Sequence, residues 1–454
     1  MLKEQIIFFL TAAALVAGPL ISLSFWQSNV NRRVEATSLA GTNNNTLQGL
    51  PQPGLPTILD GSLRVEKVVS GLQMPTSMKF SDRDKIVILE KNGAVRLVSN
   101  GVLQPNPIFN VVVRNDSERG LLGIAIANSD RSTEKTVFLY YTEPVGDQTK
   151  NRIYRYEWDG SGSFTNGKLI LDLPGEPGPN HDGGKLVIGP DGMLYAVKGD
   201  LNRRGMLQNH KDGSPPDDTS VILRTNLDGS PAQGNPFLDA SRTDSSYANL
   251  SKYYAYGIRN SFGLAFDPRT GTLWDVEDGP TEYDEMNVVT PGFNSGWARV
   301  MGPLERHFIP TKSIDELVQF PGSHYANPVF SWRQSIGITD IAFLNSTKLG
   351  EKYAYNIFVG DVNNGSLFFF KVNSNRTGLD FGSAAGLQDL VADNSVELNA
   401  VTIGTGFGGG TRGGITDIQT GPDGYLYILT FAGDLYRIVP AAASATAATD
   451  DVAE

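Results

Sequence analysis

Few residues of this chain have the type and spacing needed for chemistry, and a histidine stands out first. His181 is one of four histidines in 454 residues and lies in "PNHDGGKLVIGPDGMLYAVKGD", residues 179–200. Two strand-like runs and a Pro-Asp-Gly turn separate it from Asp200, and a hairpin brings its two ends together. A histidine oriented by a carboxylate can take a proton from an alcohol. The alternative is that His181 caps a turn and Asp200 only ends a strand.

Two further loops place polar side chains just before a strand. Arg259 and Asn260 lie in "YAYGIRNSFGLAFDP", residues 254–268, and a planar guanidinium stacks on flat rings and pairs with carboxylates. The loop could therefore hold a conjugated, acidic cofactor, although a surface arginine is the simpler interpretation. Glu118 precedes an apolar run in "RNDSERGLLGIAI", and by itself it indicates little.

An acidic loop follows in "VEDGPTEYDEMNVVTPGFNSGW", residues 276–297. Calcium prefers hard oxygen ligands, and the backbone carbonyls of an irregular loop can supply them. The spacing does not match an EF-hand, so a solvated acidic turn stays an equal alternative. The carboxylates crowd around Gly279 and Pro280: Glu277, Asp278, Glu282, Asp284 and Glu285.

The elements that must position these loops are short strands. Between residues 61 and 440, runs of alternating or apolar residues alternate with Gly, Asp and Asn turns, a pattern typical of hairpins. The unit G-P-D-G-x-L-Y occurs twice, beginning at Gly189 and Gly421. A repeated hairpin predicts a β-propeller, in which about 380 residues would give six blades of about sixty residues or eight of about forty-five. Loops from several blades then converge at one end.

The composition excludes several classes of protein. Hydrophobic residues make up 40% of the chain and charged residues 19%, enough for a sizeable core. The net charge is −11 and no basic stripe is present, so nucleic acid is not an expected partner. There is no cysteine, which excludes disulfides, thiolate metal sites and cysteine nucleophiles.

The two ends of the chain differ from its body. Ile6 to Trp26 is an uncharged apolar run, long enough to span a bilayer as a helix. We expect 1–26 to be a membrane anchor or signal segment, 27–60 a flexible linker, 61–440 the propeller and 441–454 a disordered tail. The chain is then extracytoplasmic, either anchored by the N-terminal helix or secreted.

Taken together, the stretches resemble one family. "SERGLLGIAI", "NHDGGKLVIGPDGMLYAVKGD", "GIRNSFGLAFDP", "EDGPTEYDEMNVVTPGFNSGW" and "GPDGYLYILT" are similar, in type and order, to segments of the soluble quinoprotein glucose dehydrogenases and aldose sugar dehydrogenases, also named glucose/sorbosone dehydrogenases. The resemblance implies an all-β, six-bladed β-propeller, here preceded by an N-terminal hydrophobic helix. It also implies pyrroloquinoline quinone (PQQ) and Ca²⁺ as cofactors.

The resemblance also implies roles for single residues. His181 matches the general base, and Asp200 and Asp284 match the carboxylates that support it. The remaining matches are to the cofactor, the metal and the substrate: Arg259 and Asn260 against the quinone, Gly279 and Pro280 with their carbonyls on calcium, and Glu118 and Trp332 near the sugar.

The sequence departs from the family at the cations that hold the quinone's carboxylates. Asn363 stands where a lysine is expected, and Gly414 and Thr416 stand where arginines would fall. Arg412 is close enough in sequence to be a replacement. Fewer charge-assisted hydrogen bonds imply weaker binding of PQQ.

The sequence therefore predicts oxidation of an aldose at its anomeric carbon to the lactone, with hydride transfer to PQQ assisted by His181 and with an external electron acceptor. The main alternative is a non-enzymatic extracellular propeller that binds a glycan or a protein. Hydrolysis by the acidic cluster ranks third, because no carboxylate pair stands out for that chemistry.

Overall fold

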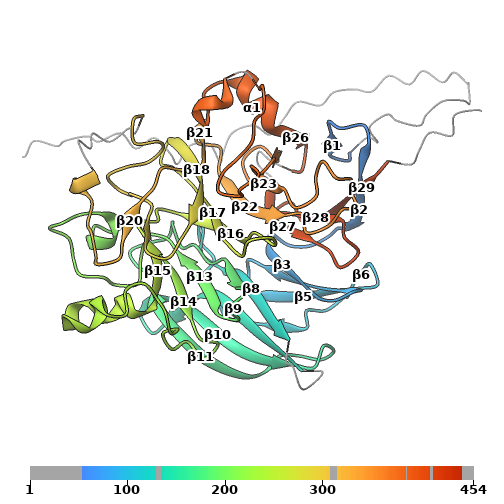
Figure 1. The fold of residues 1–454 in the computed structure, drawn as a ribbon. Helices are drawn as coiled ribbons and strands as arrows, with labels where there is room; N and C mark the ends of the chain where they lie inside the picture. Colours follow the sequence, from blue (N-terminus) through green and yellow to red (C-terminus); the bar gives the residue numbers. More distant parts are fainter. Residues whose placement is uncertain (1–53, 129–133, 307–313, 385, 409–412, 442–454) are drawn as a thin grey trace, which may run out of the picture. The chain divides into compact units, whose positions relative to one another are not determined.

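A computed structural model describes residues 54–128, 134–306, 314–384, 386–408 and 413–441. All described residues lie in one of the two units into which the chain divides, Gly49–Glu454. That unit is an all-β propeller: its strands form sheets that are mainly antiparallel, and one edge strand of each sheet contacts the edge strands of two other sheets (Figure 1).

The first three sheets along the chain use residues up to Tyr325. Their strands are β3 (Pro75–Asp82), β4 (Lys85–Glu90), β5 (Ala94–Ser99), β6 (Val102–Leu103) and β7 (Phe109–Asn110); β8 (Leu121–Asn128), β9 (Lys135–Val145), β10 (Gln148–Trp158) and β11 (Thr165–Pro174); and β12 (Leu186–Ile188), β13 (Leu194–Lys198), β14 (Val221–Thr225), β15 (Tyr253–Tyr256), β19 (Phe293–Asn294) and β20 (His324–Tyr325).

The other three sheets complete the unit and bring in the first described strands. They contain β16 (Ser261–Phe266), β17 (Leu273–Glu277), β18 (Glu282–Val289), β21 (Phe330–Gln334) and β25 (Val391–Ala392); β22 (Ile338–Phe343), β23 (Ile357–Asp361), β24 (Leu367–Phe370), β26 (Thr402–Thr405) and β1 (Thr57–Ile58); and β27 (Ile415–Thr420), β28 (Leu426–Thr430), β29 (Leu435–Pro440) and β2 (Leu63–Val69).

Helices are few and short. The α-helix of the described residues is α1 (Ser395–Val401), which Asn394 caps by accepting hydrogen bonds from the backbone N–H groups of Val396 and Glu397. The 3-10 helices are η1 (Met206–Gln208), η2 (Ala240–Arg242), η3 (Ser245–Lys252), η4 (Ile314–Glu316) and η5 (Leu387–Asp389).

The predicted fold is corrected in two respects. The hydrophobic helix expected before the propeller is not found: its residues, Ile6 to Trp26, lie outside the described residues, and among those described no helix is long and apolar enough to cross a membrane. The expected regular six-bladed repeat is not found either. The sheets have four to six strands, and parallel pairing adds β19 and β20 to one sheet and β25 to another. Long connections inside two other sheets supply these extra strands: β19 and β20 lie between β18 and β21, and β25 lies between β24 and β26. The periodic pattern could not show them.

Apolar side chains from neighbouring sheets pack against each other and hold the sheets together. Val87 and Leu89 of β4 share a buried cluster with Leu121 of β8 and with Leu139 of β9. Strands with both faces buried read as continuous apolar runs, and β13 is buried along its whole length.

The edge strands β3, β8, β12, β16, β22 and β27 contact one another in a closed ring, each against its two neighbours. The loops that enter these strands at their amino ends therefore lie close together. Three of the predicted site loops enter the ring in this way, just before β8, β12 and β16: the loops of Glu118, His181 and Asn260.

Candidate active site

The predicted base and its carboxylate are in contact. His181 Nδ1 lies 2.5 Å from Asp200 Oδ1, and both side chains are buried, with 8% and 3% exposed. The backbone of His181 has a φ of 63°, in the left-handed region that side chains other than glycine rarely adopt. Such strain persists only where surrounding contacts fix it, and it is concentrated at functional sites.

Asp200 is held as a hydrogen-bond acceptor. Its Oδ2 accepts from Trp297 Nε1 at 2.6 Å, and its Oδ1 also accepts from the Asn202 backbone N–H at 2.7 Å. Hydrogen bonds accepted on both oxygens favour the ionised carboxylate and a proton on His181 Nδ1. This tautomer leaves Nε2 of the same ring as a proton acceptor, the state that a general base requires.

Glu118 connects two of the loops. Its Oε2 accepts from the His181 backbone N–H at 2.7 Å and from Asn260 Nδ2 at 3.2 Å. Burial raises the pKa of Glu118, and the nearby imidazole and the backbone hydrogen bond offset only part of this. Glu118 therefore positions the loops of the base and of the predicted cofactor residue.

Arg259 lies across the acidic loop. Its Nη1 donates to the carbonyl oxygens of Asp278 and Gly279 at 2.8 and 3.1 Å, and its guanidinium carbon lies 5.3 Å from the centre of the Trp297 ring. Its backbone N–H donates to Glu277 Oε1 at 2.7 Å, and burial raises the pKa of Glu277 to about 7. Trp297 thus contacts both Asp200 and Arg259, and the sequence analysis missed it although it ends the quoted acidic stretch.

Asp284 joins two loops. Its oxygens accept from the N–H of Gly279 (2.9 Å), Ser335 Oγ (2.6 Å) and the N–H groups of Ile336 (2.8 Å) and Gly337 (2.9 Å). Asp284 therefore fixes the backbone of the acidic loop, and its predicted support of the base stays a prediction.

Three other residues were predicted to line the substrate or cofactor site: Trp332, Asn363 and Arg412. Trp332 is 1% exposed and packs edge-on against Phe330 in an apolar core, and its place near the sugar stays a prediction. Asn363 Nδ2 donates to the carbonyl of Ile336 at 2.9 Å. Arg412 lies outside the described residues.

The unpaired polar atoms of the site test whether a cofactor fits. Arg259 Nε, Asn260 Oδ1 and Asp278 Oδ1 are buried without a hydrogen-bond partner among the described residues. Buried polar atoms of native proteins are normally paired, so a polar ligand that meets a donor and two acceptors fits this loop cluster. The described residues contain no group of three His, Asp or Glu side chains placed for a metal, so a cation here would depend on carbonyls such as those of Gly279 and Pro280.

The family follows from a comparison of sequences. The family model described as Glucose / Sorbosone dehydrogenase matches residues 72–437, which span most of the propeller. The chain belongs to the glucose/sorbosone dehydrogenase family.

Relatives in this family differ considerably in sequence. Aldose sugar dehydrogenase YliI of Escherichia coli K12 is 27% identical over 388 residues, covering 84% of this chain and 93% of the relative. Quinoprotein glucose dehydrogenase B of Acinetobacter calcoaceticus is 28% identical over 261 residues, 52% of each chain. The PQQ-bound form of aldose sugar dehydrogenase from Streptomyces coelicolor has the same fold, with a TM-score of 0.60, 21% identity and coverage of 85% and 99%.

Proposed function

We propose that this chain is a sugar dehydrogenase that oxidises an aldose at its anomeric carbon to the lactone, with PQQ and calcium as cofactors. The observation that carries the proposal is the buried contact of His181 Nδ1 with Asp200 Oδ1, which leaves a basic ring nitrogen in a loop cluster with unpaired polar atoms. The names of the relatives, aldose sugar dehydrogenase and quinoprotein glucose dehydrogenase, support the same substrate and cofactor.

His181 acts as the base in this proposal. Nε2 takes the proton of the C1 hydroxyl, and Asp200 stabilises the imidazolium that results. Loss of that proton, together with the C1 hydrogen and its electron pair, turns the C1–O bond into the carbonyl of a lactone. The chemistry supplied by bound PQQ with calcium is acceptance of that hydride at a quinone polarised by a Lewis acid.

The other site residues of the chain bind and orient the cofactors in this proposal. Arg259 and Asn260, with their unpaired Nε and Oδ1, would hold the quinone. The carbonyls of Gly279 and Pro280 would hold calcium, which would share the Gly279 carbonyl with Arg259 Nη1 or displace it. Asp278 adds an unpaired buried oxygen in the same loop, which the sequence analysis did not assign. A Cβ on Gly279 would lie 2.2 Å from the carbonyl oxygen of Glu282, so only glycine permits this backbone.

The cations expected for the quinone's carboxylates are replaced by groups with structural contacts. The Asn363 amide bonds to the backbone of Ile336, and Thr416 Oγ1 donates to the carbonyl of Pro75 at 3.0 Å. Each missing charge-assisted contact weakens binding by about 1.5 to 3 kcal/mol. We therefore expect PQQ to bind more weakly than in relatives with the full cation set.

The direct test is a titration of the purified full-length chain with PQQ, with and without calcium, followed by absorbance and calorimetry. Dye reduction over a panel of aldoses then measures turnover. We expect calcium-dependent binding of PQQ, aldose-dependent dye reduction, and tighter PQQ binding by an Asn363→Lys, Thr416→Arg double variant.

The same titration can also contradict the proposal. If neither the parent nor the double variant binds PQQ in a calcium-dependent way, the dehydrogenase assignment is wrong. The propeller that binds a glycan or protein without catalysis then accounts better for the loss of the cations.

A further inference from the structure

A cavity of about 660 Å³ lies inside the ring of edge strands, within the size range of sites for small molecules. All six edge strands or the residues next to them contribute to its lining. None of the predicted site residues lines it. On β16 the predicted site and the cavity lie toward opposite ends. Asn260 directly precedes the strand, whereas Leu264 to Phe266, at its far end, line the cavity.

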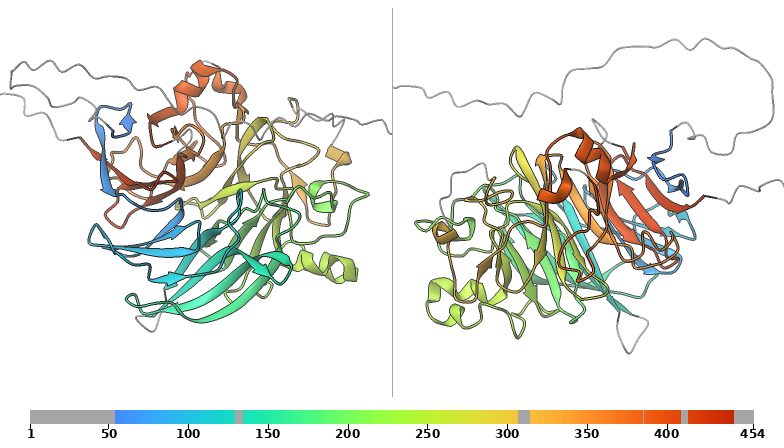
Figure 2. Two further views of the ribbon diagram at one scale, coloured as in Figure 1. Left: turned by 180° about the vertical axis from the view of Figure 1, so that it is seen from behind. Right: turned by 45° about the horizontal axis from the view of Figure 1, so that its top comes forward.

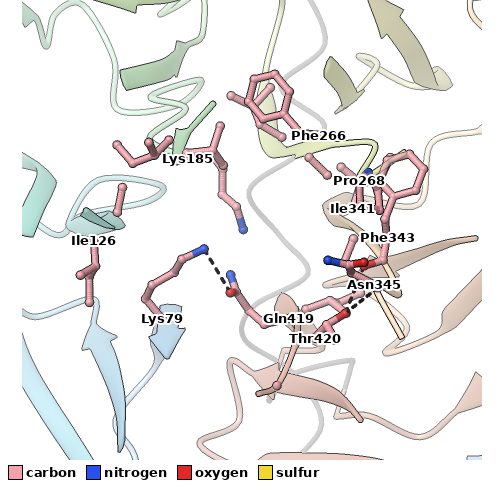
Figure 3. Close-up of a pocket in the computed structure, with 18 of the residues that line it drawn as sticks. Lys79, Ile126, Lys185, Phe266, Pro268, Ile341, Phe343, Asn345, Gln419 and Thr420 are labelled. Carbon is pink, nitrogen blue, oxygen red and sulfur yellow. Dashed lines mark hydrogen bonds between the residues drawn. The ribbon is translucent and has the colours of Figure 1, made fainter. Parts of the chain in front are cut away.

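Two lysines extend into this cavity. Figure 3 shows the amino ends of Lys79 and Lys185 converging on the space beside Gln419. Lys185 Nζ lies 2.8 Å from Asp340 Oδ1 and 3.2 Å from Asp417 Oδ1. Among the described residues, the hydrogen-bond partner of Lys79 Nζ is the neutral Gln419 Oε1, at a long distance of 3.4 Å.

The two lysines differ in their partners. Burial raises the pKa of Asp340 well above its usual range, whereas the Lys185 ammonium and hydrogen bonds from Asp340, Met78 and Ser77 lower that of Asp417. Burial and the nearby Lys185 ammonium lower the pKa of Lys79. Lys185 thus contacts two carboxyl groups, whereas the Lys79 ammonium contacts the neutral amide of Gln419.

The walls combine polar and apolar groups. The apolar side chains Ile126, Val187, Ile341 and Phe343 come from three different strands, β8, β12 and β22, and burial of an apolar ligand surface against them is favourable. An amphiphilic ligand fits this combination of an ammonium that has only an amide partner and a partly apolar wall. A strongly hydrated dianion does not, because it would lose its hydration for contact with one such ammonium.

We propose that this cavity binds a small organic monocarboxylate, with its carboxylate on Lys79 and its apolar body against the Ile341 and Phe343 wall. Asp340 and Asp417 hold Lys185 as a fixed second cation behind that position. His181 does not line this cavity, although Lys185 stands at the end of the loop that carries His181, and the proposal does not depend on sugar oxidation.

The test uses the full-length chain and benzoate as the probe, with binding measured by titration calorimetry. Benzyl alcohol is the neutral probe of the same size, and inorganic phosphate is the charge-only probe. We expect benzoate to bind and the other two probes to bind at least about tenfold more weakly, since a charge-assisted contact is lost or its apolar partner is missing.

Lys79→Met removes the ammonium and keeps the length of the side chain. We expect it to weaken benzoate at least about tenfold, whereas Lys371→Met, which removes an exposed lysine paired with Asp380, leaves benzoate binding unchanged. Unchanged binding in Lys79→Met, or phosphate binding as tight as benzoate, overturns the proposal.

A second variant guards against misfolding of Lys79→Met. Asn345 is an exposed residue of the cavity lining, so Asn345→Trp adds bulk there without touching the core. We expect it to abolish benzoate binding while the thermal unfolding midpoint is kept. Full benzoate binding by this variant also overturns the proposal.

Discussion

Two hairpins of this propeller share the same turn but not the same chemistry. In the β12–β13 hairpin, Asp191 accepts from the N–H of Met193 (3.1 Å), Tyr195 OH (3.1 Å) and Arg224 Nε (2.9 Å). In the β27–β28 hairpin, Asp423 accepts in the same way from the N–H of Tyr425 (3.2 Å), Tyr427 OH (2.9 Å) and Arg437 Nη1 (3.1 Å). The repeated unit is thus a structural device.

The difference lies at the ends of the hairpins. With the offset of 232 residues that separates Lys185 from Asp417, His181 corresponds to Gly413 and Asp200 to Ala432. One hairpin therefore ends in a base and its carboxylate, and its counterpart has residues without polar side chains there. The comparison teaches that the turn sets the geometry and the loop ends are free to carry function.

The largest expected effect distinguishes the two hairpins by activity. His181→Ala should lower aldose-dependent dye reduction by about 10²- to 10⁴-fold, since it removes the general base. Circular dichroism should be unchanged. The matched control is His324→Ala, an exposed histidine bonded to Thr290, which should keep full activity. Equal activity in both variants would remove His181 from the mechanism.

A smaller loss of activity is expected when Asp200, the carboxylate that contacts His181, is changed. Asp200→Asn keeps the shape but removes the charge that orients and stabilises the imidazole, so kcat should fall by about 10²-fold with a shifted pH profile. The control is Asp434→Asn. Asp434 lies near the end of the other hairpin, and its carboxylate accepts a hydrogen bond from Tyr436 OH. This variant should leave kcat and its pH profile unchanged. A normal pH profile in Asp200→Asn would contradict the assigned tautomer.

The hairpins should also differ in how stability depends on pH. Burial lowers the pKa of Lys198, at the end of β13, from 10.5 to about 8, and its counterpart is Thr430. Between pH 8 and 10.5 the unfolded chain holds a proton that the folded chain has released. Stability should therefore rise with pH in this window, by up to about 1.4 kcal/mol per pH unit from this group. Urea unfolding of parent and Lys198→Met at pH 8 and pH 10 measures it; the same slope in both would exclude Lys198 as the source.

The smallest effect should be the same in both hairpins. Asp191→Asn and Asp423→Asn each remove one charge from equivalent networks, and each should lower the free energy of unfolding by roughly 1 kcal/mol without changing turnover. Denaturant titration compares them directly. A loss of activity confined to Asp191→Asn would show that the first turn also serves the active site.

Contacts within one hairpin could be predicted from the sequence, whereas contacts between different sheets could not. The pairing of His181 with Asp200 follows from hairpin closure over 19 residues. The bond of Trp297 to Asp200 spans 97 residues and that of Glu118 to the His181 backbone spans 63. Such contacts depend on how neighbouring sheets meet in the ring, which local periodicity does not encode.

Burial on both faces hides the orientation of Trp332 from the sequence pattern. Trp332 lies in β21, where the first three residues are all buried, so alternation cannot show which face a side chain takes. Asp284 was expected beside the base through the family resemblance, whereas its hydrogen-bond partners Ser335 and Ile336 come from the loop after a strand that pairs with its own.

The pairing of β2 with β29 bears on how the protein is made. Leu63 pairs with Pro440 and Val69 with Leu435, and the first described strands lie beside the last in each view (Figure 2). During translation β2 leaves the ribosome long before its partner exists, so this sheet forms only after nearly the whole chain is synthesised. A nascent or truncated chain without β29 exposes the edges of β2 and β28, which makes the interval before completion the period of greatest risk of aggregation.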